Sequence, residues 1–235
     1  MPATEVLAIQ RVLRESGSPA RAEHSLRFFK TGPGQYGEGD QFLGLTVPEV
    51  RGFLPGCREL TLDEVTELLR SPWHEERLLA LLELVRRFPK EPEPIYSLYL
   101  AHIPRSINNW DLVDSSAPGI VGKFLVKHSE RPILRRLACS INLWERRVAV
   151  IATQHFIRQG QFQDTLDLCE VLLQDREDLI HKACGWMLRE AGKRDESVLL
   201  GFLEKWAAHM PRTMLRYSLE KLDPETRRRF MDLRP

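Results

Sequence analysis

Two tryptophans, an aspartate and an arginine are spaced so that a repeating helical fold would bring them to one surface. Trp110 and Asp114 are four residues apart, which places them on the same face of a helix. Arg147 and Trp186 fall in corresponding stretches of two later helices. Together these side chains would line a polar–aromatic groove.

Each of these residues also has a purely structural interpretation. A tryptophan in a helical repeat is more often part of the core than of a site. Asp114 could cap a helix with its neighbour Ser115, and Asp111 could do so equally well. Arg147 could be a solvated partner of Glu145 on a charged helix face. Spacing alone leaves both interpretations open.

Short amphipathic segments separated by prolines are the elements that would position these residues. Runs of alternating apolar and polar β-branched residues are scarce, so the chain is predicted to be all-α. Asp63 and Asp164 are predicted to cap two of the helices. The clearest predicted helices are Leu62–Arg70, Glu75–Phe88, Trp144–Gln159, Thr165–Leu173, Leu179–Ala191 and Ser197–Ala208.

The helical segments resemble one another at a spacing typical of α-solenoids. The segment 71–88 aligns without gaps on 140–157 and more loosely on 174–191. Equivalent alanines then fall at positions 80, 117, 149 and 183, at spacings of 37, 32 and 34 residues. Two helices per unit at this period predict HEAT-like repeats whose equivalent helices line a curved, concave wall able to hold a long partner. An irregular helical bundle is the alternative.

We expect one domain over residues 1–235. Its amino-terminal part, 1–60, would hold the first helices and a Gly-rich loop, and 61–235 would hold the paired-helix repeats. Charge is unevenly distributed along this domain although the net charge is only +1. Residues 101–160 carry nine Lys/Arg and four Asp/Glu, a balance of +5. This segment predicts an anionic partner, unless its charges are ordinary solvated helix faces.

Several other classes of site and location are disfavoured. The four cysteines (57, 139, 169 and 184) and seven histidines lack metal-ligand spacing, so we expect buried thiols and no metal. Gly32, Gly34 and Gly37 match G-x-G-x-x-G, but they follow a predicted helix instead of a strand, which favours a turn over a dinucleotide site. We find neither a signal peptide nor a membrane span, and expect a cytoplasmic, nucleoid-associated protein.

Four stretches of the sequence resemble the AlkD-type DNA alkylation repair family of HEAT-like repeat DNA glycosylases. They are INNWDLVD (107–114), NLWERR (142–147), HKACGWMLRE (181–190) and FFKTGPGQYGEGDQFLGLTVPEVR (28–51). The resemblance covers nearly the whole chain. It implies a monofunctional glycosylase of base excision repair that needs no cofactor and removes 3-methyladenine and 7-methylguanine from double-stranded DNA.

The resemblance also implies roles for individual residues. Asp114 matches the family's catalytic aspartate, and Trp110 and Trp186 match an aromatic pair beside the sugar of the lesion. Arg147 matches an arginine that contacts the DNA backbone. Phe28 falls where the family has a lesion-side tyrosine, so a hydroxyl contact is missing in this chain.

The implied chemistry fits these residue types. Alkylation at N3 or N7 makes the base a cationic leaving group, and a carboxylate such as that of Asp114 would stabilise the positive charge that develops on the sugar. Arg146 and Lys182 are basic neighbours that could neutralise phosphates. A non-catalytic HEAT-like module that binds branched DNA, RNA or a protein is the alternative. In either case we expect a monomer.

Overall fold

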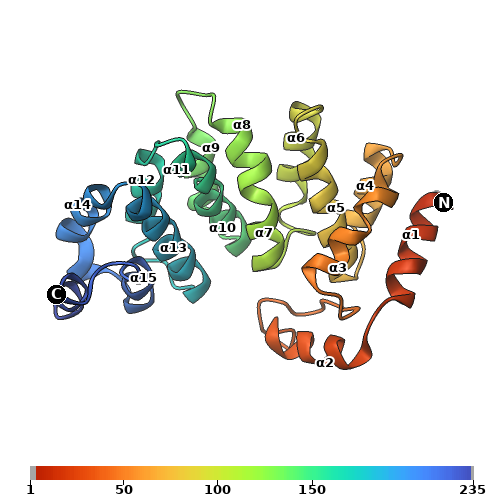
Figure 1. Ribbon diagram of the computed structural model, residues 1–235, viewed down its shortest axis with the longest axis horizontal. Helices are drawn as coiled ribbons and strands as arrows, with labels where there is room; N and C mark the ends of the chain where they lie inside the picture. The colour runs from red at the N-terminus through yellow and green to blue at the C-terminus, as the bar shows by residue number, and fades with distance from the viewer. Residues whose placement is uncertain (1–3, 234–235) are drawn as a thin grey trace. The chain divides into compact units, whose positions relative to one another are not determined.

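The computed structural model describes residues 4–233, and helices make up its regular structure (Figure 1). Across these residues there is no β-strand, and the only strand-like pairing is an isolated parallel bridge between Gln41 and Trp73. The prediction of an all-α fold of helical repeats is therefore confirmed. The chain divides into two compact units, one up to Ser116 and the other from Ala117 onward.

The first unit is built from α-helices of six to fourteen residues and one 3₁₀ helix of four residues. The last of them, α7, ends on the first residue of the second unit. In chain order they are α1 (Thr4–Glu15), α2 (Pro19–Phe28), α3 (Val47–Gly52), the short 3₁₀ helix η1 (Leu54–Cys57), α4 (Leu62–Leu69), α5 (His74–Arg87), α6 (Pro92–His102) and α7 (Trp110–Ala117).

The second unit opens on a π-helical turn and continues with shorter and longer helices. No helix in residues 4–233 is long and apolar enough to cross a bilayer. The elements are η2 (Pro118–Gly122), α8 (Lys123–Leu125), α9 (Pro132–Ala138), α10 (Leu143–Ala152), α11 (Gln154–Arg158), α12 (Gln163–Val171), α13 (Asp178–Arg194), α14 (Glu196–Trp206), η3 (Ala207–His209), α15 (Arg212–Ser218) and α16 (Pro224–Met231).

Helix α4 shows how the sequence defines these elements. The Thr61 hydroxyl accepts a hydrogen bond from the Glu64 N–H, and the Glu64 carboxylate accepts one from the Thr61 N–H, which is a capping box. Val65 and Leu68 are buried on the side of the helix that packs against α5. The prediction that Asp63 caps this helix is wrong, because Asp63 lies inside the first turn.

Repeat stacking is clearest in the second unit. Successive helices pack in pairs: η2 on α10, α10 on α13, and α13 on α15. Beside them, α9 packs on α12. The alanines that align in the repeat, at positions 80, 117, 149 and 183, are all fully buried. Small side chains at these positions therefore lie at helix interfaces, as the repeat register predicts.

Two predictions about the second unit are wrong. The continuous helix predicted for 144–159 is divided between α10 and α11, because Thr153 interrupts it: the buried Thr153 hydroxyl donates to the Val150 carbonyl, 2.7 Å away. Asp164 does not cap α12 but lies within it, where its carboxylate pairs with Arg131.

The expectation of buried thiols holds for three of the four cysteines. Cys57, Cys169 and Cys184 are buried and free, whereas Cys139 is exposed at the end of α9. Burial raises the pKa of Cys57 to about 11, with a contribution from the nearby Glu83 carboxylate. Such a thiol stays protonated and behaves as a small apolar side chain.

At Gly122, η2 packs tightly against the junction of α10 with α11. A Cβ at this position would lie 2.3 Å from the Ala152 carbonyl oxygen and 2.8 Å from the His155 Cβ. We therefore predict that Gly122→Ala lowers the free energy of unfolding by about 1–3 kcal/mol, measured by urea denaturation. Gly201→Ala is the control: a Cβ added at this position of α14 would meet no neighbouring atom within 4 Å, so this change should stabilise the protein by about 1 kcal/mol. Equal effects of the two substitutions would contradict the packing argument.

Candidate functional site

Helix α7 carries Trp110 and Asp114 one turn apart, and both side chains are half-buried. The helix begins after Asn109, whose side-chain oxygen accepts a hydrogen bond of 2.9 Å from the Trp110 N–H. Tyr99 of α6 fastens α7, because its buried hydroxyl lies 2.9 Å from the Ser116 Oγ. Burial and, to a smaller extent, the negative charge of Asp114 raise the pKa of the Tyr99 phenol, so this hydroxyl stays protonated.

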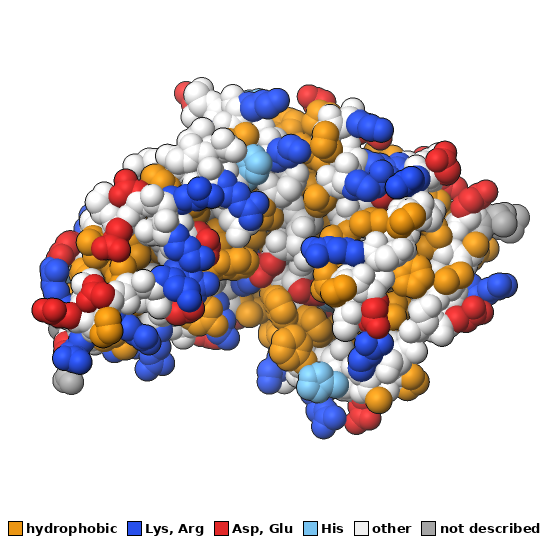
Figure 2. All heavy atoms as spheres, in the orientation of Figure 1, with side chains coloured by type: hydrophobic (Ala, Val, Ile, Leu, Met, Phe, Trp, Pro, Cys, Tyr) orange, Lys and Arg blue, Asp and Glu red, His pale blue; other side chains and the backbone are white. Residues whose placement is uncertain are grey.

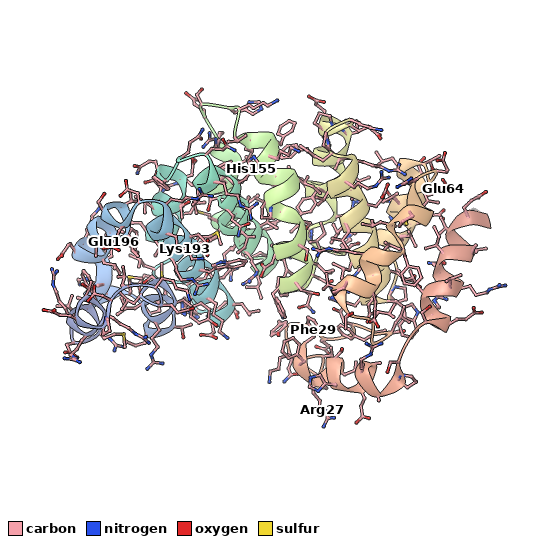
Figure 3. All side chains as sticks on the ribbon, in the orientation of Figure 1. Arg27, Phe29, Glu64, His155, Lys193 and Glu196 are labelled. Carbon is pink, nitrogen blue, oxygen red and sulfur yellow. The ribbon has the colours of Figure 1, made fainter. Side chains whose placement is uncertain are left out.

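Trp110 belongs to an aromatic cluster at the surface of the first unit. Its indole stacks on Phe29, with ring centroids 5.4 Å apart, and meets Phe28 edge to face at 5.8 Å. Phe29 also stacks on the buried Phe42 at 4.8 Å. The Phe28 side chain is 55% exposed. Figure 2 shows hydrophobic side chains gathered at the surface beside α2, in the region where Figure 3 labels Phe29.

A buried network of charged side chains adjoins the aromatic cluster. The His74 ring contacts Phe42, and its Nε2 lies 2.7 Å from the Asp111 carboxylate. Its Nδ1 lies 3.4 Å from the Asp40 carboxylate, which also accepts a 2.7 Å hydrogen bond from Arg77. None of these four polar side chains is more than 12% exposed. Two carboxylates and two cations therefore balance one another away from water.

The network keeps His74 in its charged form. Burial alone disfavours the imidazolium, but the charge of Asp111 and the hydrogen bonds to Asp111 and Asp40 outweigh it and raise the pKa of His74 to about 9. Burial likewise acts against the Asp40 carboxylate, but the hydrogen bond from His74 and the charge of Arg77 lower the Asp40 pKa below its usual value. At neutral pH both ring nitrogens of His74 therefore donate hydrogen bonds.

The Gly-rich loop 31–40 brings Asp40 into this network. The loop follows α2, so its glycines do not sit between a strand and a helix as a dinucleotide site requires. The Gly37 N–H donates to the Lys30 carbonyl at 3.1 Å, and a Cβ on Gly37 would lie 2.4 Å from the Phe29 carbonyl oxygen. The loop thus turns tightly back on the end of α2.

The sequence pattern does not predict Asp40 and His74 as site residues. They are 34 positions apart, and neither belongs to a recognisable ligand or catalytic spacing. The sequence shows only that His74 to Arg77 are four consecutive polar residues near a predicted helix start, and the structure shows that all four are buried. Consecutive buried polar residues require partners, and the partners come from distant segments.

The second unit carries Arg147 and Trp186. Arg147 on α10 is only 4% exposed, and its guanidinium donates a 2.6 Å hydrogen bond to the Leu179 carbonyl at the start of α13. Trp186 is half-buried on α13, and its Nε1 donates to the Glu190 carboxylate at 3.2 Å. Arg147 thus ties together the two helices from which these predicted site residues come.

The predicted phosphate-binding residues Arg146 and Lys182 both have carboxylate partners. Arg146 pairs with Asp175 at 2.7 Å, and Lys182 pairs with Asp178 at 2.8 Å. The Lys182 side chain is 39% exposed. Figure 2 shows Lys and Arg side chains gathered over α11 and α13, where Figure 3 labels Lys193. The DNA-binding role of Arg146 and Lys182 stays a prediction.

Comparison with known proteins places the chain in a family. A family model described as "DNA alkylation repair enzyme" matches residues 9–222. The chain belongs to the DNA alkylation repair enzyme family. Membership in this family implies an enzyme that acts in DNA alkylation repair and binds DNA.

One solved structure has the same fold as this chain. The structure titled "Predicted DNA alkylation repair enzyme from Enterococcus faecalis" is 17% identical in sequence. The alignment covers 88% of this chain and 97% of that chain, with a TM-score of 0.73. No curated protein matches the chain in sequence.

The charged network should give stability a characteristic pH dependence. Because folding raises the pKa of His74 from 6.5 to about 9, its contribution is complete below pH 6.5 and is lost as pH rises through 9. Because folding lowers the pKa of Asp40, its contribution is lost as pH falls below about 4. We predict that urea denaturation finds the stability advantage of wild type over His74→Gln shrinking by about 3 kcal/mol between pH 6.5 and 9. A constant difference over that range would contradict a charged His74.

Proposed function

We propose that this protein is a monofunctional DNA glycosylase that hydrolyses the N-glycosidic bond of cationic N3- or N7-alkylpurines in duplex DNA. The observation that carries the proposal is the half-buried Asp114, one helical turn from Trp110. A carboxylate and an indole on one face of α7 are the groups needed to stabilise a cationic sugar. Family membership supplies the DNA alkylation repair context.

The reaction needs little from the protein beyond charge stabilisation and a positioned water. The alkylated base leaves as the bond to C1′ breaks, taking the electron pair and losing its positive charge. Positive charge develops on the deoxyribose, where Asp114 stabilises it. Water then adds to C1′ and its proton passes to Asp114 and on to solvent, leaving an abasic sugar.

The exposed aromatic cluster supports contact with the lesion. Phe28 is largely exposed and meets Trp110 edge to face, so two aromatic surfaces lie on the same side of the first unit as the start of α7. Apolar aromatic faces accept a flat cationic base by stacking and cation–π attraction, worth about 0.5–2 kcal/mol. Because Phe28 has no hydroxyl, recognition by this residue depends on shape and charge, with no directional hydrogen bond.

We assign supporting roles to residues of the second unit. Trp186 would contact the sugar, and Arg147, Arg146 and Lys182 would contact the DNA backbone. The exposed part of Lys182 suits a direct phosphate contact. Arg147 is buried and bonded to the Leu179 carbonyl, so its role would be to hold α13 in position as much as to reach a phosphate.

Substitution of Asp114 tests the proposed reaction. We predict that Asp114→Asn reduces single-turnover release of 3-methyladenine and 7-methylguanine from methylated duplex DNA at least about a hundredfold, because an amide cannot stabilise the cationic sugar. Released bases are measured by mass spectrometry. Binding to duplex DNA, measured by fluorescence anisotropy, should change much less.

Asp63→Asn is the matched control, since Asp63 is an exposed carboxylate in the same unit. It should leave base release unchanged. The proposal fails if wild type releases no more base than a protein-free sample, or if Asp114→Asn is fully active.

A non-catalytic nucleic-acid or protein-binding module is the second candidate. It is favoured by one observation: Arg146 and Arg147 are both engaged inside the second unit, so fewer cations there are directed toward a partner. Salt dependence separates phosphate binding from other kinds of recognition. For a DNA enzyme we predict that the logarithm of the association constant for duplex DNA falls by about 0.9 per neutralised phosphate with each unit increase in the logarithm of the salt concentration.

Anisotropy titrations of duplex DNA at several salt concentrations measure this slope. Lys182→Ala should reduce the slope by about 0.9, the value for one phosphate contact. Lys90 is an exposed lysine of the first unit, and Lys90→Ala should leave the slope unchanged. Affinity for duplex DNA that is independent of salt would favour a protein-binding module.

A further inference from the structure

We infer that His74 is a positioning residue: clamped between Asp40 and Asp111, it fixes the Gly-rich loop against the first turn of α7 and so sets where Trp110 meets Phe28. The inference rests on the proposed function, in which Trp110 and Phe28 contact the lesion. His74 itself is buried, and its ring nitrogens are both engaged. It therefore acts through these neighbours and not on the reacting atoms.

The first step of the argument concerns the start of α7. Asp111 directly follows Trp110, and its carboxylate receives the 2.7 Å hydrogen bond from His74. Asn109 directly precedes Trp110, and its amide donates to Asp40 at 3.1 Å. Both neighbours of Trp110 are thus bound to the network. A displacement of the network must therefore move the backbone that carries the indole.

The second step concerns the end of α2. Phe28 ends α2, and Phe29 and Lys30 connect it to the Gly-rich loop, whose far end is Asp40. Asp40 is held by Arg77 and His74 of α5, so the loop is anchored at its end to a helix of the unit's interior. The loop's turn at Gly37 packs directly on the Phe29 carbonyl. The aromatic residues of α2 therefore depend on the same buried carboxylate as α7 does.

The third step concerns the ring stacking. His74 lies 4.6 Å from Phe42 and 5.0 Å from Phe29, measured between ring centroids. Phe29 in turn stacks on Trp110 at 5.4 Å. A charged imidazolium is attracted to these aromatic faces, which links the ionic network to the stack that supports Trp110.

Charge, and not only shape, is what the clamp requires. An imidazolium donates from both nitrogens, so it can bridge two carboxylates, whereas a neutral ring donates from one. Loss of its proton would leave two buried carboxylates, Asp40 and Asp111, facing a single cation, Arg77. Like charges in a low-dielectric interior repel strongly, so the loop and α7 would separate.

The indole N–H signal of Trp110 in ¹⁵N-labelled full-length protein reports this positioning without any reaction. The signal is assigned by its loss in Trp110→Phe. In wild type it should shift with pH, with a midpoint near 9. In His74→Gln we expect the signal to be displaced already at pH 7 and to show no such transition. A Trp110 signal that His74→Gln leaves at its wild-type position overturns the inference.

Two further variants keep the test decisive. Asp111→Asn removes one carboxylate and preserves side-chain size, so the midpoint should fall below that of wild type; an unchanged midpoint counts against the clamp. It also serves as the test if His74→Gln does not fold, as judged by circular dichroism. His102→Gln is the control, because His102 is a half-buried histidine of the same unit whose Nδ1 bonds to the Leu98 carbonyl of its own helix. It should retain the wild-type transition.

Kinetics then connect positioning to the reaction. In His74→Gln the single-turnover rate of base release should fall about tenfold to a hundredfold, while the dissociation constant for duplex DNA stays within about twofold. A normal rate with weakened DNA binding would overturn the inference. If wild type releases no bases, the proposed function fails, and the Trp110 signal alone still decides whether His74 positions the aromatic residues.

Discussion

The hydrogen bonds from His74 to Asp40 and Asp111 are the interaction on which the first unit's candidate site depends. They join segments that are otherwise distant in the chain: the end of the Gly-rich loop, the start of α5 and the first turn of α7. Burying charge is costly unless each group is paired. Here Arg77 completes a set of two anions and two cations, so the pairing stabilises this arrangement of the segments over others.

Two buried carboxylates next to His74 also join distant segments of the first unit. Glu75, next to His74, accepts hydrogen bonds from the backbone N–H groups of Leu43, Gly44 and Leu45. Glu76 accepts from Gln10 and from Arg14 of α1. Successive side chains at the start of α5 therefore bind different segments: His74 binds Asp40 and α7, Glu75 binds residues 43–45, and Glu76 binds α1. Because the Glu75 carboxylate accepts hydrogen bonds from backbone N–H groups, residues 29–46 are held in a defined position although they have little regular structure.

The aromatic and ionic parts of the site divide the work expected of a repair enzyme. In the proposed function, the exposed Phe28 and half-buried Trp110 would offer apolar surface to a base, and Asp114 would offer charge one turn further along α7. In the second unit, Lys and Arg side chains gather over α11 and α13. Arg146 on α10 and Lys182 on α13, the proposed phosphate contacts, already have carboxylate partners. Phosphates would have to compete with those carboxylates for the two cations, which would weaken the contacts that Arg146 and Lys182 make with DNA. The DNA alkylation repair family is consistent with this division.

Patterns in the sequence are sufficient to predict the helical fold and the shared helix face of Trp110 and Asp114, because these follow from periodicity within one or two turns of chain. They also predict the buried alanines, through the longer repeat of 32 to 37 residues. Predictions from local sequence were wrong where two neighbouring residues could play the same role: Thr61, and not Asp63, caps α4. They were also wrong at Thr153, which divides a segment with the pattern of one helix into α10 and α11. Only the tertiary structure revealed the clamp of His74, Asp40 and Asp111. Asp40 lies 34 residues before His74 in the chain, and Asp111 lies 37 residues after it. No local pattern encodes which buried carboxylate a buried imidazole will meet. That pairing depends on which segments pack together, since burial is what makes each charge require a partner.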